Sequence, residues 1–173
     1  MLNPREKNIK MKTIFITGAT SGIGKATAET FAKQGHRLII CGRRKEVLEQ
    51  LQIELSNITE VYSLVFDVRN QEENAIYSLP EEWKNIDVLV NNAGNAHGLE
   101  SISEGNIADW DAMMDGNVKG LLYVSQPIIK IMKARNTGHI INISSVAARQ
   151  TYANGVVYCA SKRAVDVISE GMR

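Results

Sequence analysis

The glycine-rich segment at residues 17–24, Thr-Gly-Ala-Thr-Ser-Gly-Ile-Gly, constrains the fold of this chain more than any other feature. It follows an apolar run at residues 13–16, which is typical of a buried strand, and it precedes a stretch with helical character. A strand, a glycine turn and a helix in this order form the context of a dinucleotide-binding fingerprint. Gly18 can adopt backbone angles closed to other residues. The lack of a Cβ at Gly22 and Gly24 lets a pyrophosphate approach the backbone and lets the helix pack on the strand.

The same segment predicts which residues contact that ligand. Free N–H groups in the first turn of the helix would face its phosphates, and the helix dipole adds to the attraction. The spacing Gly-x-x-x-Gly-x-Gly is also compatible with an ordinary glycine-rich turn, so the motif alone leaves both interpretations open. The residues predicted to contact the ligand are Gly18, Thr20, Ser21, Gly22, Ile23 and Gly24.

Strand and helix patterns alternate along the rest of the chain, as in a parallel sheet with helices on both faces. The sequence therefore predicts the α/β class, with a Rossmann-like doubly wound parallel sheet. A single domain is expected at residues 12–173, preceded by a loose tail at residues 1–11. The predicted strands are residues 12–17, 37–41, 60–66, 86–90 and 139–143. The predicted helices lie within residues 22–35, 45–55, 71–78, 109–134 and 157–173.

Charge and composition give no indication of a nucleic-acid or membrane partner. Lys and Arg number 20 against 19 Asp and Glu, so the formal net charge is only +1,. The start of the chain is polar and lacks the apolar centre of a secretory signal. Cys41 and Cys159 do not have the spacing of metal ligands. We therefore expect a cytoplasmic protein that acts on a small molecule and uses no metal.

Arg43 stands where a cofactor-selecting residue is expected. It follows Gly24 by 19 residues (43 − 24), directly after the second predicted strand. An acidic residue near this position would bind the ribose 2′-hydroxyl of NAD, whereas a guanidinium suits the 2′-phosphate of NADP. Arg43, with Arg44 as a secondary contact, thus predicts NADP(H) as the cofactor. The alternative is a solvated helix start that happens to be basic.

Polar and small residues follow the third and fourth predicted strands. Asp67 and Val68 come after the third, and Asn91, Ala93 and Gly94 come at the end of the fourth. Ligands of open parallel sheets bind at the carboxyl ends of strands. Asp67 is therefore predicted to accept a hydrogen bond from adenine, and the other residues to lie against the cofactor. Ordinary turn chemistry explains the same residue types.

Four further residues form a candidate catalytic set. Tyr158 and Lys162 are four residues apart on a predicted helix and so share one face,. A nearby ammonium favours the phenolate form of a tyrosine, which can then exchange a proton with an alcohol or a carbonyl. Ser145 can donate a hydrogen bond to the same oxygen. Asn117 lies on an apolar helical stripe with residues 110, 113, 114, 121, 122 and 125, where a buried structural amide is the alternative,.

Taken together, these motifs resemble the short-chain dehydrogenase/reductase family over residues 12–173. Thr-Gly-x-x-x-Gly-Ile-Gly, Asn-Asn-Ala-Gly, the mid-helix Asn, the Ser and Tyr-x-x-x-Lys occur in family order. The resemblance implies that Tyr158 donates or accepts the proton, that Ser145 positions the carbonyl, and that Lys162 also holds the nicotinamide ribose. It further implies that Asn117 holds a water molecule linking Lys162 to solvent.

A narrower similarity concerns residues 41–45 and 78–94, which resemble the NADP-dependent 3-hydroxy acid dehydrogenases that act on serine and reduce malonic semialdehyde. Arg149 is the charged residue of the loop before the catalytic helix. It is predicted to pair with a substrate carboxylate, or else to be a solvated loop arginine. A 3-oxoacyl or general carbonyl reductase, and a catalytically silent NADP(H)-binding module, remain the alternatives.

Family members continue beyond the Tyr-Lys helix with more strands and a substrate-covering segment. The resemblance therefore implies a sheet that is incomplete at the C-terminus and an exposed edge at residues 140–143. Because family members often pair through the long helix and the Tyr-Lys helix, it also implies a homo-oligomer, either a dimer or a tetramer.

Overall fold

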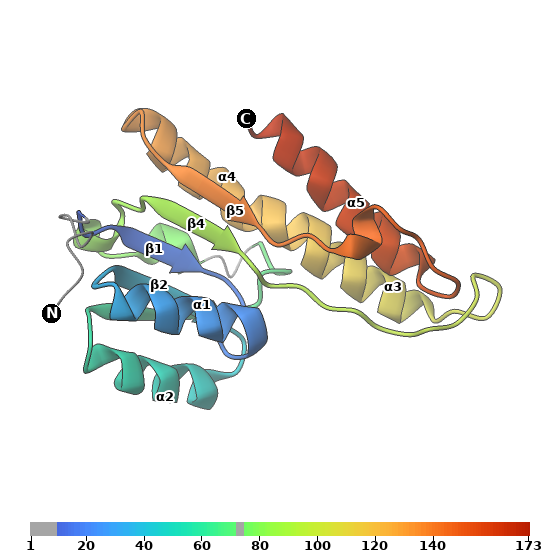
Figure 1. Cartoon of the computed structure of the whole chain (residues 1–173), viewed down its shortest axis with the longest axis horizontal. Coiled ribbons are helices and arrows are strands. Elements are labelled where there is room, and N and C mark those ends of the chain that lie inside the picture. Colours follow the sequence, from blue (N-terminus) through green and yellow to red (C-terminus); the bar gives the residue numbers. More distant parts are fainter. Residues whose placement is uncertain (1–9, 72–74) are drawn as a thin grey trace, which may run out of the picture.

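The protein folds around one parallel sheet, as the alternating pattern predicts. The structure is a computed structural model that describes residues 10–71 and 75–173. Within these residues the sheet has five strands in the order β3-β2-β1-β4-β5, all parallel (Figure 1). The strands are β1 (Thr13–Ile16), β2 (Arg37–Gly42), β3 (Val61–Val65), β4 (Val88–Asn91) and β5 (His139–Asn142).

Helices cover both faces of this sheet. On one face lie α1 (Gly22–Lys33) and α2 (Lys45–Ser56), and on the other lies α4 (Gly120–Ala134). Two further helices, α3 (Ile107–Met114) and α5 (Val156–Gly171), pack against each other at the end of the molecule near the carboxyl edge of the sheet. Short 3₁₀ helices are η1 (Ala75–Ser78), η2 (Glu81–Trp83) and η4 (Val146–Ala148).

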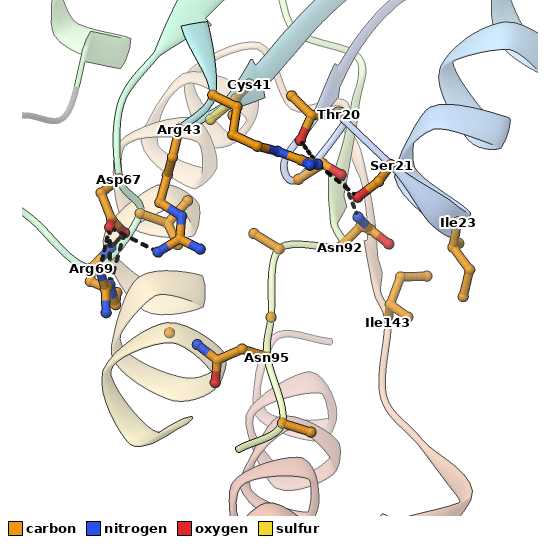
Figure 2. Close-up of a pocket in the computed structure, with 18 of the residues that line it drawn as sticks. Thr20, Ser21, Ile23, Cys41, Arg43, Asp67, Arg69, Asn92, Asn95 and Ile143 are labelled. Atoms are coloured by element: carbon orange, nitrogen blue, oxygen red, sulfur yellow. Dashed lines mark hydrogen bonds and ion pairs between the residues drawn. The ribbon is translucent and has the colours of Figure 1, made fainter. Parts of the chain in front are cut away.

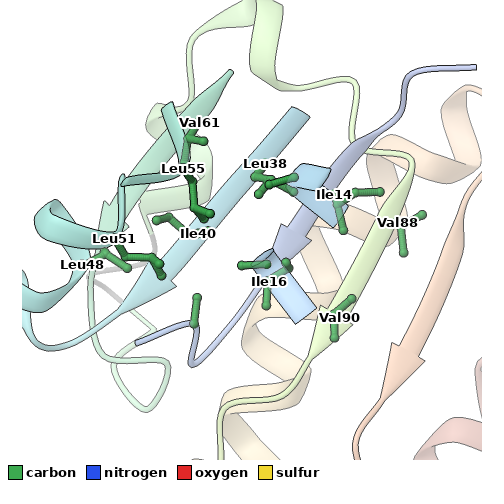
Figure 3. Packing of buried hydrophobic residues seen from close by; sticks show 13 residues of the cluster. Ile14, Ile16, Leu38, Ile40, Leu48, Leu51, Leu55, Val61, Val88 and Val90 are labelled. Carbon is green, nitrogen blue, oxygen red and sulfur yellow. The ribbon is translucent and has the colours of Figure 1, made fainter. Parts of the chain in front are cut away.

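The strands are apolar because both of their faces are buried. Ile14, Ile16 and Ile40 point toward α1 and α2, where Leu48 and Leu51 of α2 meet them (Figure 3). The alternate strand residues, such as Phe15 and Ile39, point to the opposite face and pack with Val124 and Ile128 of α4. The central strands are thereby held rigidly, and their carboxyl ends point toward one edge.

The long helix predicted at residues 109–134 exists, but a π turn interrupts it. The turn, η3 (Asp115–Lys119), separates α3 from α4 and contains Asn117. Because a π turn adds one residue, the apolar stripe of α3 is rotated relative to that of α4. The single predicted stripe is therefore wrong in part, since Met114 and Leu122 are exposed while Met113 and Leu121 are buried.

The helix predicted at residues 71–78 is also wrong in part. The described end of this segment is the 3₁₀ helix η1, which stops two residues before Pro80. The α region is disfavoured for the residue that precedes a proline, so a helix cannot easily extend to the residue before Pro80. Residues 72–74 lie outside the described residues, as do residues 1–9 of the predicted tail. None of the helices found in the described ranges combines the length and the apolarity needed to cross a membrane.

Candidate active site

A cleft of about 760 Å³ runs along the carboxyl edge of the sheet (Figure 2). The turn after β1 and the ends of β2, β3, β4 and β5 contribute to it, together with the first turns of α5. Most residues predicted from the sequence line this cleft: Gly18, Thr20, Ser21, Ile23, Arg43, Arg44, Asp67, Val68, Ala93, Gly94, Ser145, Tyr158 and Lys162. The structure thus brings together side chains from the whole length of the chain.

The glycine turn forms one wall of the cleft. Gly18 and Gly22 have φ angles of 64° and 54°, in the left-handed region that favours glycine,. Gly24 has a different role, because a methyl group there would overlap the carbonyl of Gly18 and the side-chain amide of Asn92. Asn92 holds the turn by donating to the carbonyls of Thr17 (3.0 Å) and Gly18 (3.1 Å).

Asn92 has a role that the sequence motif does not predict. Its neighbours in Asn-Asn-Ala-Gly were predicted to contact a cofactor, but Asn92 instead joins the end of β4 to the glycine turn. The hydroxyl of Thr17 completes this joint by accepting hydrogen bonds from the N–H groups of Asn92 (3.0 Å) and Ala93 (2.9 Å). The two loops at the centre of the cleft therefore form one hydrogen-bonded unit.

Arg43 and Arg44 diverge after β2. Arg44 donates to the hydroxyls of Thr20 (2.8 Å) and Ser21 (3.0 Å), and so lies over the glycine turn. Arg43 turns the other way, with its Nη1 3.5 Å from Oδ2 of Asp67 (Figure 2). Both guanidinium groups border the cleft, where they favour an anionic ligand.

Asp67 is held by a residue that the sequence analysis passed over. Arg69 Nη2 lies 2.7 Å from Asp67 Oδ2, and Arg69 Nε is within 3.1 Å of both carboxylate oxygens. Burial alone would raise the pKa of Asp67, but the hydrogen bonds and charge of Arg69, with the charge of Arg43, lower it below its ordinary value,. Asp67 is thus a carboxylate already paired with arginine.

At the other end of the cleft, Asn117 connects three segments. Its Oδ1 accepts from the N–H of Asn95 (2.7 Å), and its Nδ2 donates to the carbonyl of Asn95 (2.8 Å) and to Oγ of Ser161 (3.0 Å). Ser161 in turn donates to the carbonyl of Tyr158 (2.7 Å). Asn117 does not line the cleft. It ties the π turn and the chain after β4 to α5, and its predicted role with water stays a prediction.

Tyr158 and Lys162 both reach the cleft from one face of α5. Lys162 is 6% exposed, and its Nζ donates to the carbonyl of Ile143 (3.0 Å). Burial lowers the pKa of Lys162, because it disfavours the charged ammonium,. A methyl group on Gly94 would lie 3.4 Å from Lys162 Nζ and 2.9 Å from Asn117 Oδ1. The glycine after β4 thus leaves room beside Lys162.

Ser144 and Ser145 are distinguished by their hydrogen bonds. Ser144 donates its hydroxyl to the carbonyl of Lys162 (3.3 Å), so its proton is directed into the protein. Ser145 caps η4 by accepting from the N–H of Ala147 (3.2 Å), and its own proton remains available to a ligand,. The geometry therefore agrees with the assignment of Ser145 as the donor to a carbonyl oxygen.

Five predicted site residues are not among those that line the cleft: Gly22, Gly24, Asn91, Asn117 and Arg149. Asn91 is buried, and its Nδ2 donates to Ser125 Oγ (2.9 Å) and Asn142 Oδ1 (2.8 Å), so this side chain joins strands β4 and β5 to α4. Arg149 has an 82% exposed side chain whose Nε is 4.0 Å from Asp166. Arg149 is not among the residues that line the cleft, which favours the interpretation as a solvated loop arginine. Its pairing with a substrate carboxylate stays a prediction.

A second cavity of about 20 Å³ lies on the far side of Tyr158. Tyr158 is the residue common to its lining and that of the cleft. Polar residues such as His97 and Asn154 line it together with Trp110 and Met113. This volume accommodates about one water-sized group. A ligand that places its reacting oxygen at Tyr158 therefore finds room for only a small additional group there.

Comparison with known proteins agrees with this geometry. The NADP-dependent 3-hydroxy acid dehydrogenase of Escherichia coli K12 is 44% identical over 162 residues, which are 92% of this chain and 64% of that protein. Serine 3-dehydrogenase of Rhizobium radiobacter is 42% identical over 163 residues, which are 93% of this chain and 64% of that protein. The chain thus spans about 64% of the length of these curated relatives.

A solved structure, described as the closed form of serine dehydrogenase complexed with NADP⁺, matches with a TM-score of 0.87 and 44% identity. The match covers 93% of this chain and 65% of that chain. The sequence profile described as short chain dehydrogenase matches residues 12–173. With the glycine turn, the Ser-Tyr-Lys cluster and the parallel sheet in place, we conclude that this chain belongs to the short-chain dehydrogenase family.

Proposed function

We propose that this protein is an NADP(H)-dependent oxidoreductase that interconverts a small 3-hydroxy acid and its carbonyl form. The observation that carries the proposal is the convergence of Ser145, Tyr158 and Lys162 at one end of a cleft whose other end has the glycine turn and two arginines. A proton-transfer group and a dinucleotide-binding wall in one cleft are what a dehydrogenase of this kind requires.

The cleft has the features needed to hold NADP(H). The left-handed backbone of Gly18 and the start of α1 would bind the pyrophosphate, because N-cap Ser21 makes no side-chain capping bond to the first-turn N–H groups,. Arg43 and Arg44 would bind the 2′-phosphate, and Lys162 the nicotinamide ribose. When bound, NADP(H) supplies or accepts the hydride.

The protein's own contribution is the transfer of a proton at Tyr158. Tyr158 and Lys162 lie together in the cleft, where the phenol can give its proton to a carbonyl oxygen or receive one from an alcohol,. Ser145 donates a hydrogen bond to the same oxygen and stabilises the negative charge that develops there. Asn117 fixes the start of α5, and with it the position of Tyr158.

The substrate class rests on similarity and on the size of the second cavity. Relatives at 42–44% identity are a 3-hydroxy acid dehydrogenase and a serine 3-dehydrogenase. The cavity beyond Tyr158 has space for a small polar group. We also propose a cytoplasmic homo-oligomer, because both cysteines are buried free thiols and family members often pair,. Light scattering would test the oligomer.

Replacement of Tyr158 by Phe tests the proposal. It removes one oxygen from the cleft, and we expect turnover of a 3-hydroxy acid with NADP⁺ to fall by about 10³-fold, within the range for loss of a general acid–base group. Binding of NADPH, followed by its fluorescence, should stay within about twofold because the phosphate-binding wall is unchanged.

Tyr152→Phe is the matched control. Tyr152 lies outside the cleft lining and packs its ring against Gly155 at the start of α5, so loss of its hydroxyl should leave turnover unchanged. If the gene encodes residues beyond Arg173, the same variants are measured in that longer product. Turnover by Tyr158→Phe equal to that of the unmodified protein would show that the proposed reaction is wrong.

A further inference from the structure

Several charged side chains lie together at the end of the cleft formed by the residues that follow β2 and β3. Three guanidinium groups, those of Arg43, Arg44 and Arg69, line it together with the carboxylate of Asp67. Figure 2 shows Arg69 and Arg43 on two sides of that carboxylate, with Thr20 and Ser21 across the cleft. A carboxylate at this place opposes the binding of a phosphate, so its neutralisation matters for the choice of ligand.

Arg69 makes most of the contacts that neutralise this carboxylate. Its Nε and Nη2 form a fork on Asp67, and its backbone N–H adds a bond of 3.0 Å to Oδ1. The turn that follows β3 makes this possible, because it brings a residue two positions later back onto the carboxylate. Both oxygens of Asp67 therefore accept charge-assisted hydrogen bonds from Arg69, which are stronger than those between neutral groups,.

Arg43 is left with the weaker position. Its Nη1 is 3.5 Å from Oδ2, an oxygen that already accepts a bond of 2.7 Å from Arg69. The side chain of Arg43 is 60% exposed, against 38% for Arg69 and 22% for Asp67. Arg43 is thus beside the carboxylate without being bound tightly to it, and its remaining donors face the cleft.

We propose that Arg69 is a positioning residue that sets the preference for a 2′-phosphate, because it neutralises Asp67 and so leaves Arg43 free to bind the phosphate. This inference rests on the proposed function, in which the cleft binds NADP(H). Without Arg69, Asp67 would be an unpaired carboxylate that repels the phosphate and draws Arg43 into a close ion pair. Arg69 need not contact the cofactor to have this effect.

The test uses two probes that differ only by the 2′-phosphate: adenosine 2′,5′-bisphosphate and AMP. Calorimetric titration gives the ratio of their dissociation constants for the unmodified protein and for each variant. Effects on the adenine site cancel in this ratio. We expect the unmodified protein to prefer the bisphosphate, and Arg69→Gln to reduce that preference by roughly tenfold, the effect of one added unit charge near a phosphate at a partly exposed site.

Three further variants separate charge from structure. Arg69→Lys keeps the charge and should retain most of the preference. Asp67→Asn leaves the charge of Arg69 unopposed and should increase the preference for the bisphosphate. The double variant Asp67→Asn with Arg69→Gln has the same net charge as the original pair, and should restore the preference that Arg69→Gln loses. If Arg69 only held the loop in place, the double variant should not restore the preference, because it lacks the side-chain ion pair between Arg69 and Asp67.

The outcomes are distinct. If the unmodified protein binds both probes equally, the proposed NADP(H) specificity is wrong and this inference is overturned with it. If the preference exists but is unchanged in Arg69→Gln, or is not restored in the double variant, the proposed function stands and the role of Arg69 is wrong. Circular dichroism of each variant checks its folding, and Arg69→Lys provides a test should Arg69→Gln fail to fold.

Discussion

The two ends of the cleft are built by different means. Around β1 and β2, apolar residues are buried on both faces of the sheet, and the glycine turn takes its shape from backbone angles and close packing. Around β5 and α5, the strand residues Ile140 and Ile141 are only partly buried, and polar side chains hold the elements together. Close packing dominates in the first half, where Asn92 and Thr17 add hydrogen bonds between the loops, whereas the second half depends mainly on a few hydrogen bonds.

This difference has a physical consequence. Packing around the first half is distributed over many contacts, and its close-packed interior leaves little room for added volume,. The second half depends on individual donors and acceptors, because β5 is the edge strand of the described sheet and pairs with β4 alone. Loss of one buried amide leaves several partners unsatisfied at once.

Gly24→Ala should have the largest effect of the substitutions that address this comparison. The added methyl group overlaps the carbonyl of Gly18 and the amide of Asn92, so the turn must open. We expect the free energy of unfolding to fall by about 3 kcal/mol, at the upper end for overpacking, and NADPH binding to weaken. Denaturant unfolding measures the first effect and fluorescence titration the second.

Gly171→Ala is the control for this substitution, because nothing lies within 4 Å of a methyl group at that helical position. It should leave both measurements unchanged. If Gly24→Ala were as stable as the original protein, close packing would not determine the shape of the glycine turn. The contrast between the two ends of the cleft would then be wrong for the first end.

Asn117→Ala should have the next largest effect. It removes three hydrogen bonds and leaves the backbone of Asn95 and the hydroxyl of Ser161 without this partner. The expected loss is about 2 kcal/mol of unfolding free energy, as for buried polar groups left unsatisfied. Turnover should fall with it because Tyr158 shifts, while binding of AMP at the opposite end should be retained.

Asn57→Ala provides a matched control at an exposed helix end, where the side chain donates only to carbonyls of its own helix. We expect a loss below about 1 kcal/mol for that variant. Should Asn117→Ala weaken AMP binding as much as it reduces turnover, the two halves of the cleft would not be independent.

The smallest effect concerns pH and the buried histidine of the first half. Burial and the nearby Lys12 lower the pKa of His36 below its ordinary value of 6.5, and Asp87 only partly opposes them. His36 Nδ1 accepts a hydrogen bond from the backbone N–H of Lys12 (3.3 Å), which protonation would remove. The unfolded chain therefore takes up a proton first as the pH falls below 6.5, and folding stability decreases until the lowered pKa is passed.

Urea unfolding between pH 7.5 and pH 5 measures how steeply the free energy of unfolding changes with pH. This range extends on the order of one unit to either side of the ordinary pKa of histidine. His36→Gln should reduce this slope, whereas His139→Gln, an exposed position at the start of β5, should not. An unchanged slope in His36→Gln would assign the acid sensitivity to other groups. Asp67 and Asp87, whose pKa values are also lowered, lose their contribution to stability at still lower pH.

Much of the fold and of the site follows from local patterns. The apolar strands, the glycine turn and the four-residue spacing of Tyr158 and Lys162 are properties of short segments, and the structure has all of them. The prediction for Gly18 is confirmed by its φ of 64°. The prediction for Gly24 was incomplete, because the neighbour that excludes a side chain there is Asn92, far away in the sequence.

By itself, the sequence determined the order of the elements, the cleft-lining glycines and the Ser-Tyr-Lys set, because each depends on backbone preferences or on helical spacing within a few residues. Only the tertiary structure decided how Asn117 joins Asn95 and Ser161, and how Arg69 closes on Asp67 while Arg43 lies farther from it. These roles depend on which donors and acceptors meet after the strands have aligned. Hydrogen bonds act over about 3 Å, and separation along the chain does not predict that distance.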